Sequence, residues 1–289
     1  MANEYLNLSP MSLTRNKKDN WRKMNIVFSA DDAYVQPLAI AMVSILENNI
    51  SNSRINFHVL TADISENNQK ILHLILNKYN IGNIEFIFIN EDMFNNFPLN
   101  IKHISKEAYF RYVIADVLPK AKKALYLDAD ILVLGDLSEL WDTNMDDFFI
   151  AGSHKDYFAK EFPGYKEKIG LREDDIYINS GVILMNLEKI RKFHKVKELF
   201  DNTEKLKDII KIQDQDIINI TFNKGIRNIS NIYNYTESDR RIGHRGNEEV
   251  TIVHFNTGNK PWNVDFQYSD SNKYFADKYQ KFKDKAINA

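Results

Sequence analysis

The chain has no cysteine among its 289 residues, so it forms no disulfide, holds no zinc thiolate and carries no thiol nucleophile. No apolar run approaches the roughly 20 residues that a membrane-spanning helix requires. Neither sign of charge is in excess, because 38 Lys and Arg residues face 40 Asp and Glu residues, and this balance does not favour a nucleic-acid partner. With 44% hydrophobic residues, the chain fits a cytoplasmic globular protein with a sizeable core.

The two ends of the chain differ in composition from the middle. Residues 1–23 are polar and lack the apolar core of a secretory signal, so we interpret them as a leader that could be disordered. Residues 24–264 form the predicted single domain, and residues 265–289 form a tail with lysines and aromatic residues at helical spacing. Such a helix suits an anionic membrane surface, which predicts peripheral membrane association. The alternative is a helix that packs its aromatic residues on the domain.

The first half of the chain alternates predicted strands and helices. The strands are expected over 25–29, 55–61, 83–89 and 124–127, and the helices over 34–49, 65–79 and 106–117. This order implies right-handed crossovers and an α/β fold, with a mostly parallel sheet flanked by helices on both faces. The second half is less regular, with strands expected over 148–152, 177–185, 226–229 and 251–254 and helices over 186–194, 196–205 and 214–222.

The segment KALYLDADILVLGDL, residues 123–137, is central to the interpretation. Its first apolar run predicts a buried strand that ends at Asp128-Ala129-Asp130. Residues two apart in extended chain point to the same side, so Asp128 and Asp130 could converge on one cation beyond the carboxyl edge of the sheet, with Ala129 leaving room. A buried, hydrogen-bonded turn is the alternative. The motif alone is not specific, because Asp214-Gln215-Asp216 is a second copy of it.

The turn after the first predicted strand reads Ser29-Ala30-Asp31-Asp32-Ala33-Tyr34. Nucleotides bind at this place in many α/β folds, but the turn contains neither G-x-G-x-x-G nor a P-loop, which disfavours both of those sites. Asp31 could accept a hydrogen bond from a base, and Tyr34 could stack on it. The alternative is that Asp31 or Asp32 only caps the next helix.

Two basic residues lie at and after the last predicted strand. His254 ends that strand, and a histidine nitrogen beside two carboxylates favours an ion such as Mn²⁺ over Ca²⁺. Lys260, in Lys260-Pro261-Trp262, could bind a phosphate as a point charge. The alternatives are a core histidine with satisfied hydrogen bonds and a solvated surface lysine.

Three further places put polar residues next to apolar chain. Arg111 lies among bulky apolar neighbours and needs a carboxylate or a ligand. Asn179-Ser180-Gly181 opens an apolar strand, and its side chains are expected to face the same crevice as the acids. Gln213 to Asp216 opens a predicted helix, where an Asp could instead act as an N-terminal cap beside the helix dipole.

Seven segments together resemble the family 8 retaining glycosyltransferases, which include lipopolysaccharide galactosyl- and glucosyltransferases and glycogenin. In chain order they are NIVFSADDAY, HISKEAYFRYVIADVLP, KALYLDADILVLGDLSELW, GYKEKIG, YINSGVILMNLEKIR, QDQDIIN and HFNTGNKPW. The resemblance spans roughly residues 25–262 and implies the GT-A nucleotide-sugar fold. It also implies transfer of a hexose, with retention, from UDP-galactose or UDP-glucose to a saccharide or lipid-linked acceptor.

The resemblance assigns roles to the residues at matching positions. The ligands of Mn²⁺, or of Mg²⁺ as an alternative ion, would be Asp128, Asp130 and His254. The donor-sugar shell would be Arg111, Asn179, Ser180, Asp214 and Gln215, with Gln215 and Asp214 as the catalytic residues. The uracil contacts would be Asp31 and Tyr34, with Ser29 nearby, the diphosphate contact Lys260, and the acceptor-orienting residue Asp156. Ala30, Ile104, Ala129, Thr257 and Gly258 complete the predicted substrate-binding set.

Two positions depart from the family pattern. Ala33 replaces a polar residue common in D-D-x-Y, and Thr257 stands where H-x-x-G-x-x-K-P-W usually has glycine, with Gly258 one place late. The rival from another class is a non-catalytic nucleotide-sugar-binding protein on the same fold, against which the intact ligand set argues. A sugar-phosphate nucleotidyltransferase, the second rival, would need a Gly-rich first turn with Arg or Lys.

Overall fold

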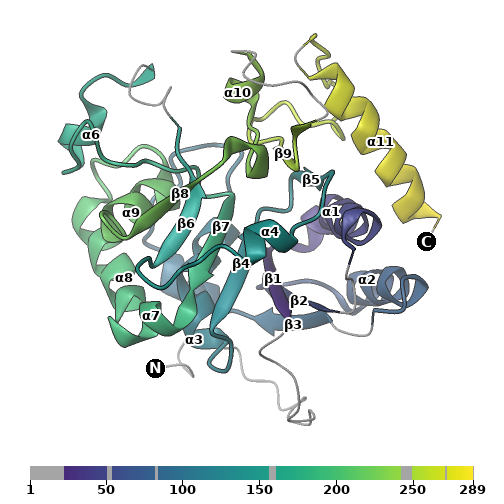
Figure 1. Ribbon diagram of the computed structural model, residues 1–289, viewed down its shortest axis with the longest axis horizontal. Coiled ribbons are helices and arrows are strands. Elements are labelled where there is room, and N and C mark those ends of the chain that lie inside the picture. Colours follow the sequence, from purple (N-terminus) through teal and green to yellow (C-terminus); the bar gives the residue numbers. More distant parts are fainter. Residues whose placement is uncertain are drawn as a thin grey trace.

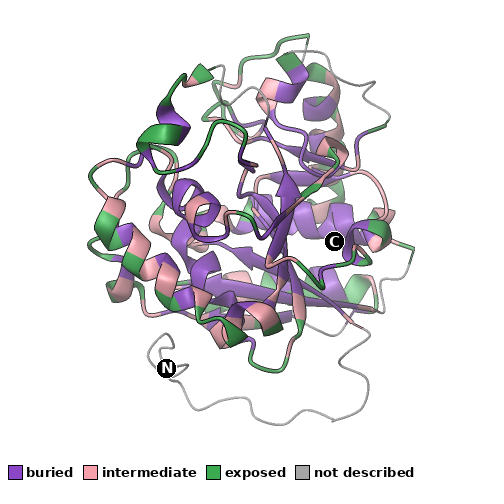
Figure 2. Ribbon diagram, turned by 60° about the vertical axis from the view of Figure 1, so that its left-hand side comes forward, coloured by how far each residue is buried: buried purple, intermediate pink, exposed green. Residues whose placement is uncertain are grey.

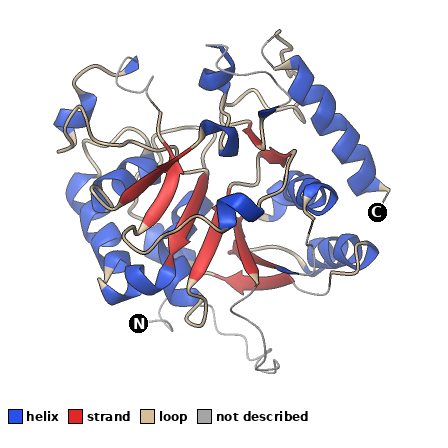
Figure 3. Ribbon diagram, in the orientation of Figure 1, coloured by secondary structure: helices blue, strands red, loops and turns tan. Residues whose placement is uncertain are grey.

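A seven-stranded sheet forms the centre of the computed structural model, which describes residues 23–50, 54–81, 84–155, 161–241, 249–270 and 272–288. Nearly all of the predicted leader lies outside these residues. The strand order is β3-β2-β1-β4-β7-β6-β8, with the strands labelled in Figure 1 and coloured red in the same view in Figure 3. The strands are β1 (Met24–Ser29), β2 (Ile55–Thr61), β3 (Ile84–Phe88), β4 (Lys123–Leu127), β6 (Ile150–Ser153), β7 (Val182–Asn186) and β8 (Ile226–Ile229).

Pairing in this sheet is mostly parallel, as predicted, but β7 runs against both of its neighbours. The pairs β1–β2, β2–β3, β1–β4 and β6–β8 are parallel, whereas β4–β7 and β6–β7 are antiparallel. The start of an antiparallel strand lies at the carboxyl edge of its neighbour. The backbone amide of Asp128 accordingly donates to the Gly181 carbonyl oxygen at 2.8 Å. The polar residues before β7 therefore meet the acids that follow β4.

Helices cover both faces of the sheet (Figure 1). On one face lie α1 (Val35–Asn48) and α2 (Glu66–Lys78), and on the other η6 (Lys106–Val113), α3 (Ile114–Val117), α7 (Leu187–Lys192), α8 (Lys195–Leu206) and α9 (Gln213–Thr221). Alternate strand residues feed the two cores, since Ile26 and Phe28 pack on the α1 side and Val27 on the other. Figure 2 shows the central strands as mostly buried. A mostly parallel sheet with helices on both faces confirms the predicted α/β class.

A separate two-stranded antiparallel sheet joins distant parts of the chain. It consists of β5 (Ile131–Val133) and β9 (Ile252–His254), and its register pairs Ile131 with His254. This pairing brings the histidine to the turn that contains Asp128 and Asp130. The remaining short elements are η3 (Asp32–Tyr34), η5 (Glu91–Phe94), α4 (Ser138–Trp141), α6 (Tyr165–Lys168), η7 (Asn231–Tyr233) and α10 (Glu237–Arg241).

Two predicted elements differ from the structure. The helix expected over 106–117 is a 3₁₀ helix for its first eight residues and α-helical only over the last turn. There the Arg111 side chain donates to the Ala108 carbonyl oxygen at 2.6 Å, an acceptor that an α-helix would use for its own backbone. The strand expected over 177–185 begins only at Val182, because the Asn219 side chain binds the Ile178 amide at 2.7 Å.

The tail forms α11 (Lys273–Ile287), which lies beside α1 (Figure 1). Its Phe275 and Tyr279 are fully buried in a cluster with Tyr235 and Phe255. The structure therefore has the alternative arrangement for the tail, in which the aromatic residues pack on the domain. In the described ranges, no helix combines the length and the apolar character needed to cross a membrane.

Candidate active site

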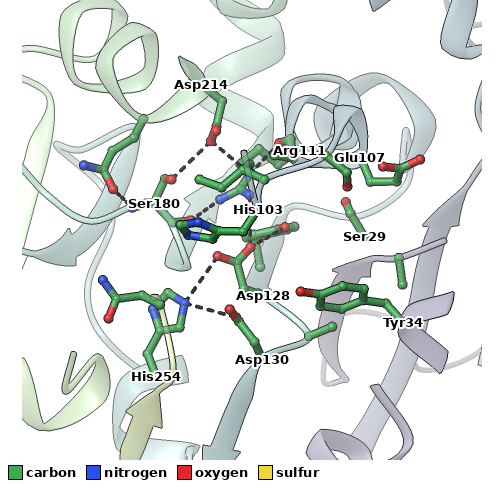
Figure 4. Close-up of a pocket in the computed structure, with 18 of the residues that line it drawn as sticks. Ser29, Tyr34, His103, Glu107, Arg111, Asp128, Asp130, Ser180, Asp214 and His254 are labelled. Carbon is green, nitrogen blue, oxygen red and sulfur yellow. Dashed lines mark hydrogen bonds and ion pairs between the residues drawn. The ribbon is translucent and has the colours of Figure 1, made fainter. Parts of the chain in front are cut away.

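A pocket opens at the carboxyl edge of the sheet, beyond β1 and β4 (Figure 4). The predicted site residues that line it are Ser29, Ala30, Asp31, Tyr34, Ile104, Arg111, Asp128, Ala129, Asp130, Asn179, Ser180, Asp214, Gln215, His254 and Lys260. Asp156 lies outside the described residues. Thr257 and Gly258 are described but do not belong to the lining. Gly258 still lies close by, since a Cβ atom added to it would be 3.7 Å from His103 Nδ1.

The turn after β1 supplies one end of the pocket. Asp31 Oδ1 accepts a hydrogen bond from the Tyr34 amide at 2.8 Å, so Asp31 caps η3 and lines the pocket as well. The Ser29 hydroxyl is buried and has no hydrogen-bond partner among the described residues. The Tyr34 ring packs edge-on against Trp262, with centroids 6.0 Å apart. Burial, with help from the charge of Asp130, raises the pKa of Tyr34, so its phenol stays neutral.

Asp128, Asp130 and His254 form a cluster whose potential ligand atoms all lie within 4.8 Å of one another. His254 Nε2 is 3.1 Å from Asp130 Oδ1 and 3.6 Å from Asp128 Oδ2. Burial opposes ionisation of Asp130, but nearby positive charge, above all the Lys260 ammonium, outweighs burial and lowers the pKa of Asp130. Both acids thus converge as predicted, although residues 129 and 130 form a turn and not the extended chain on which the prediction was based.

Gly181 lies directly against this cluster. A Cβ atom at position 181 would be 2.6 Å from Asp128 Oδ2 and would overlap the His254 ring. Real Cβ atoms do not come this close, so only glycine allows the start of β7 to pass beside the acids and the histidine.

Arg111 joins the Asp128 side of the pocket to α9. Its Nη2 donates to Asp128 Oδ1 at 3.0 Å, its Nε lies 3.2 Å from Asp214 Oδ2, and its Nη1 donates to the Ser180 carbonyl oxygen at 2.5 Å. The guanidinium also lies 4.4 Å above the Tyr126 ring. Burial raises the pKa of Asp214 to about 6, even though Arg111 favours the charged form. Arg111 thus has the carboxylate partners that its apolar sequence neighbours require.

Gln215 follows Asp214 on α9 and also faces the pocket. Its Oε1 accepts hydrogen bonds from Asn179 Nδ2 at 2.9 Å and from the Ser180 amide at 3.2 Å. Its Nε2 donates to the Tyr177 hydroxyl at 3.3 Å. The amide is therefore held in one orientation by groups on the segment before β7.

Lys260 is only 5% exposed, so the interpretation as a solvated surface lysine is wrong. Its Nζ donates to Asp130 Oδ2 at 2.5 Å and to the Phe255 carbonyl oxygen at 2.6 Å. The ammonium thus lies beside the carboxylate cluster, where it can also reach an anionic ligand.

Sequence reasoning missed several residues of the site. His103, Glu107, Tyr126 and Asn256 line the pocket, and burial followed by the charge of Lys260 lowers the pKa of His103. Tyr126 could have been found, because it stands two residues before Asp128 in the strand and so shares its face. Its hydroxyl donates to Asp128 Oδ1 at 2.7 Å. His103 and Glu107 lie in the matched segment HISKEAYFRYVIADVLP and Asn256 lies in HFNTGNKPW, but the resemblance assigned no role to any of the three.

The residues of the cluster fit a divalent cation. Asp130 Oδ1 is buried and receives no hydrogen bond from the described residues. Two carboxylates and one imidazole converge there, a donor set that suits Mn²⁺ or Mg²⁺ better than the softer ions that prefer thiolates. The acids and the histidine thus present acceptor atoms to a common point, which a cation would neutralise.

The family described as "Glycosyl transferase family 8" has a sequence model that matches residues 25–265. A protein of Haemophilus influenzae named "Putative glycosyltransferase" is 31% identical over 83% of this chain and 73% of its own length. The lipopolysaccharide 1,3-galactosyltransferase of Salmonella typhimurium is 27% identical, again over 83% of this chain and 73% of its own length.

Solved structures of glycosyltransferases superpose on this fold. The galactosyltransferase LgtC, in complex with donor and acceptor sugar analogs, superposes with a TM-score of 0.81 at 33% identity, covering 91% of this chain and 96% of that chain. The glycosyltransferase GlyE of Streptococcus pneumoniae superposes with a TM-score of 0.68 at 23% identity, covering 92% of this chain and 62% of that chain. The predicted GT-A fold is confirmed by these similarities.

Proposed function

This chain belongs to glycosyl transferase family 8 and is a hexosyltransferase, and on that premise we propose that it uses a UDP-sugar, needs Mn²⁺ and retains the anomeric configuration. The donor is UDP-galactose or UDP-glucose, and the acceptor is a saccharide or a lipid-linked saccharide. The proposal places the reaction in the cytoplasm. Relatives named as lipopolysaccharide glucosyl- and galactosyltransferases support this choice of substrates.

The observation that carries the proposal is the convergence of charged groups at one pocket. The carboxylate–histidine cluster and Lys260 lie on one side, and Arg111 with Asp214 lies on the other. A member of this fold that had lost catalysis would be expected to lose its cation ligands first, and here all three ligands are present. The non-catalytic alternative is therefore disfavoured.

Departure of a diphosphate requires neutralisation of negative charge more than it requires a proton. A cation held by Asp128, Asp130 and His254 would supply Lewis-acid stabilisation of the diphosphate when bound. Lys260 adds a positive charge beside Asp130 and can turn to a phosphate oxygen. Positive charge then develops on the sugar, and the carboxylate of Asp214 stabilises it.

Retention requires either a covalent sugar–enzyme species or attack of the acceptor on the same face as departure. Gln215 is a poor nucleophile because it is an amide, and two hydrogen bonds already occupy its oxygen. Asp214 is bound to Arg111 and to the Ser180 hydroxyl. We therefore propose transfer on the same face, in which the departing diphosphate oxygen takes the acceptor's proton and Gln215 stabilises the cationic sugar.

The test is a donor screen that measures products as well as turnover. Purified protein is incubated with Mn²⁺ and each UDP-sugar, with and without saccharide acceptors, and UDP release and product configuration are recorded. Acceptor-stimulated UDP release with retention supports the proposal. Pyrophosphate-dependent formation of UTP would identify a nucleotidyltransferase instead, and binding without turnover would identify a binding protein.

Peripheral membrane binding remains a weaker part of the proposal, because the aromatic face of α11 is buried. The groups that remain for an anionic surface are exposed lysines such as Lys281, together with the exposed Ile287 at the end of the helix. Pelleting with anionic liposomes tests this contact. Equal recovery of the parent protein and of Lys281→Glu, at low salt, would exclude α11 as a membrane contact.

A further inference from the structure

Asn234 connects the cation cluster to Gln215, although it does not line the pocket. It follows η7, is fully buried, and has a side-chain amide with a partner on each side. Its Oδ1 lies 3.0 Å from His254 Nδ1, and its Nδ2 donates to Asn179 Oδ1 at 2.9 Å. Its main-chain carbonyl oxygen accepts a hydrogen bond from Lys155 Nζ at 2.7 Å. One amide therefore contacts both the histidine of the cluster and the residue that binds Gln215.

The direction of these hydrogen bonds follows from groups that can only donate or only accept. The Tyr177 hydroxyl donates to the Asp216 carboxylate, so its oxygen is left to accept from Gln215 Nε2. Gln215 Oε1 must then face Asn179 Nδ2. The Ser180 backbone amide, which can only donate, binds the same Oε1 and requires the same orientation.

The hydrogen bonds of Asn179 and Asn234 determine which ring nitrogen of His254 carries a proton. Asn179 Oδ1 accepts from the Gly181 backbone amide at 3.1 Å as well as from Asn234 Nδ2. Asn234 therefore presents Oδ1, an acceptor, to His254 Nδ1, and Nδ1 must carry the ring proton. In the neutral ring, His254 Nε2 is then a bare acceptor that faces Asp130 Oδ1 across 3.1 Å.

We propose that Asn234 is a positioning residue that holds the tautomer of His254 and the amide orientation of Gln215 at the same time. In the opposite tautomer, Nε2 would carry the proton and donate it to Asp130, so a proton would occupy the place of the cation. Asn234 disfavours that state, because its Oδ1 would then face an unprotonated Nδ1. The inference rests on the proposed function, in which the cation and Gln215 act on the same donor.

Two substitutions separate the two contacts of Asn234. Asn234→Ala removes both, whereas Asn234→Asp keeps an acceptor for His254 Nδ1–H but removes the donor to Asn179. Asn25→Asp is the matched control, because Asn25 is also buried and its Oδ1 also lies beside a histidine nitrogen, His58 Nε2, at 3.3 Å. Asn25 stands near the start of β1, whereas the pocket lies beyond the end of that strand.

The first measurement is the tautomer itself, read from ¹⁵N-histidine NMR in EDTA at a pH above the usual histidine pKa, with His254→Ala to identify the signals. The parent and Asn234→Asp should show the Nδ1–H form at His254, and Asn234→Ala should shift toward Nε2–H. In calorimetry without donor, Asn234→Ala should bind Mn²⁺ about ten- to a hundredfold more weakly, the usual scale for losing a hydrogen-bond partner of a ligating histidine. Asn234→Asp should keep nearly the parent affinity.

Transfer kinetics test the Gln215 contact. Asn234→Asp should lower kcat about tenfold or more with little change in the donor KM. The reason is that Gln215 stabilises the transition state and not the bound donor, so its misplacement affects only the rate. An Nε2–H tautomer in the parent, equal Mn²⁺ affinity of the parent and Asn234→Ala, or the same losses in Asn25→Asp would each overturn the inference. If the tautomers are as expected but the parent binds no Mn²⁺, the proposed function fails and the hydrogen-bond assignment stands.

Discussion

The chain contains two Asp-x-Asp sequences, and the structure uses them in opposite ways. Asp128 and Asp130 stand in the turn after β4, and their oxygens converge with His254 on one point. Asp214 and Asp216 stand in the first turn of α9. Asp214 faces the pocket, whereas Asp216 accepts hydrogen bonds from the Tyr165 and Tyr177 hydroxyls in the core.

The difference comes from the backbone and not from the residues. The turn over residues 128–130 brings Asp128 and Asp130 to one side, whereas side chains two apart in an α-helix are about 200° apart. The electrostatic consequences differ too. Asp130 has a lowered pKa because nearby positive charge, above all the Lys260 ammonium, outweighs the effect of burial, while burial raises the pKa of Asp214 to about 6. A short acidic motif therefore predicts a cation site only when the element that carries it is known.

The largest expected effect comes from disrupting the first pair. Asp130→Asn and His254→Ala should each lower kcat by about a hundredfold or more, the scale of losing a transition-state charge stabiliser. Asp216→Asn, as the matched change in the second pair, should leave Mn²⁺ affinity unchanged in the folded protein. The rates are measured by UDP release and the affinities by calorimetry. Parent activity that survives EDTA would contradict the assignment.

Substitution of Gln215, which stands between Asp214 and Asp216, should have the next largest effect on the rate. Gln215→Ala should lose roughly ten- to a thousandfold in kcat, an electrostatic-scale effect, and its product should still have the retained configuration. Product NMR gives the configuration. An intact sugar adduct trapped on Gln215 or Asp214, formed fast enough for turnover, would show a covalent route instead.

Substitution of the two acids of α9, Asp214 and Asp216, should have different effects on the free energy of unfolding. Asp216→Asn should lower the free energy of unfolding by about 3 kcal/mol, because both oxygens of the buried carboxylate accept hydrogen bonds and Asn has only one acceptor oxygen. Oδ2 accepts from the Lys211 and Ile212 backbone amides, and Oδ1 accepts from the Tyr177 hydroxyl. Asp214→Asn should leave stability at neutral pH unchanged or raised, because it removes a buried charge that is costly to form. Urea unfolding in EDTA measures both. Equal losses would mean that the two acids have the same structural role.

The smallest expected effect is the pH dependence of Asp214. Its folded-state pKa of about 6 is above the usual 3.8, so the protonated group stabilises the fold below about pH 4 and this contribution is lost as pH rises through 6. The difference in unfolding free energy between the parent and Asp214→Asn should thus fall across that window, by no more than roughly 3 kcal/mol. A difference that is flat or rises with pH would show that the pKa of Asp214 is not raised.

Much of this arrangement could be predicted from the sequence, because it depends on local patterns. Apolar runs predicted most of the strands of the central sheet, and Asp128 and Asp130 could be placed at the end of one. The reversed direction of β7 could not be predicted, since it depends on which neighbour the strand pairs with. Nor could the burial of Lys260 or the contacts of Asn234, because both depend on groups far away in the chain.

Gly181 sets a limit on how this protein can vary or be redesigned. The residue carries no functional group, and its phi angle is one that any amino acid can adopt, yet the overlap described above leaves no volume for even a methyl group beside His254 and Asp128. Adding that methyl would displace the histidine or the acid while every charged residue stays in place. In a library of variants, this position should accept no other amino acid, and Gly181→Ala is a route to an inactive protein with an unaltered set of polar groups.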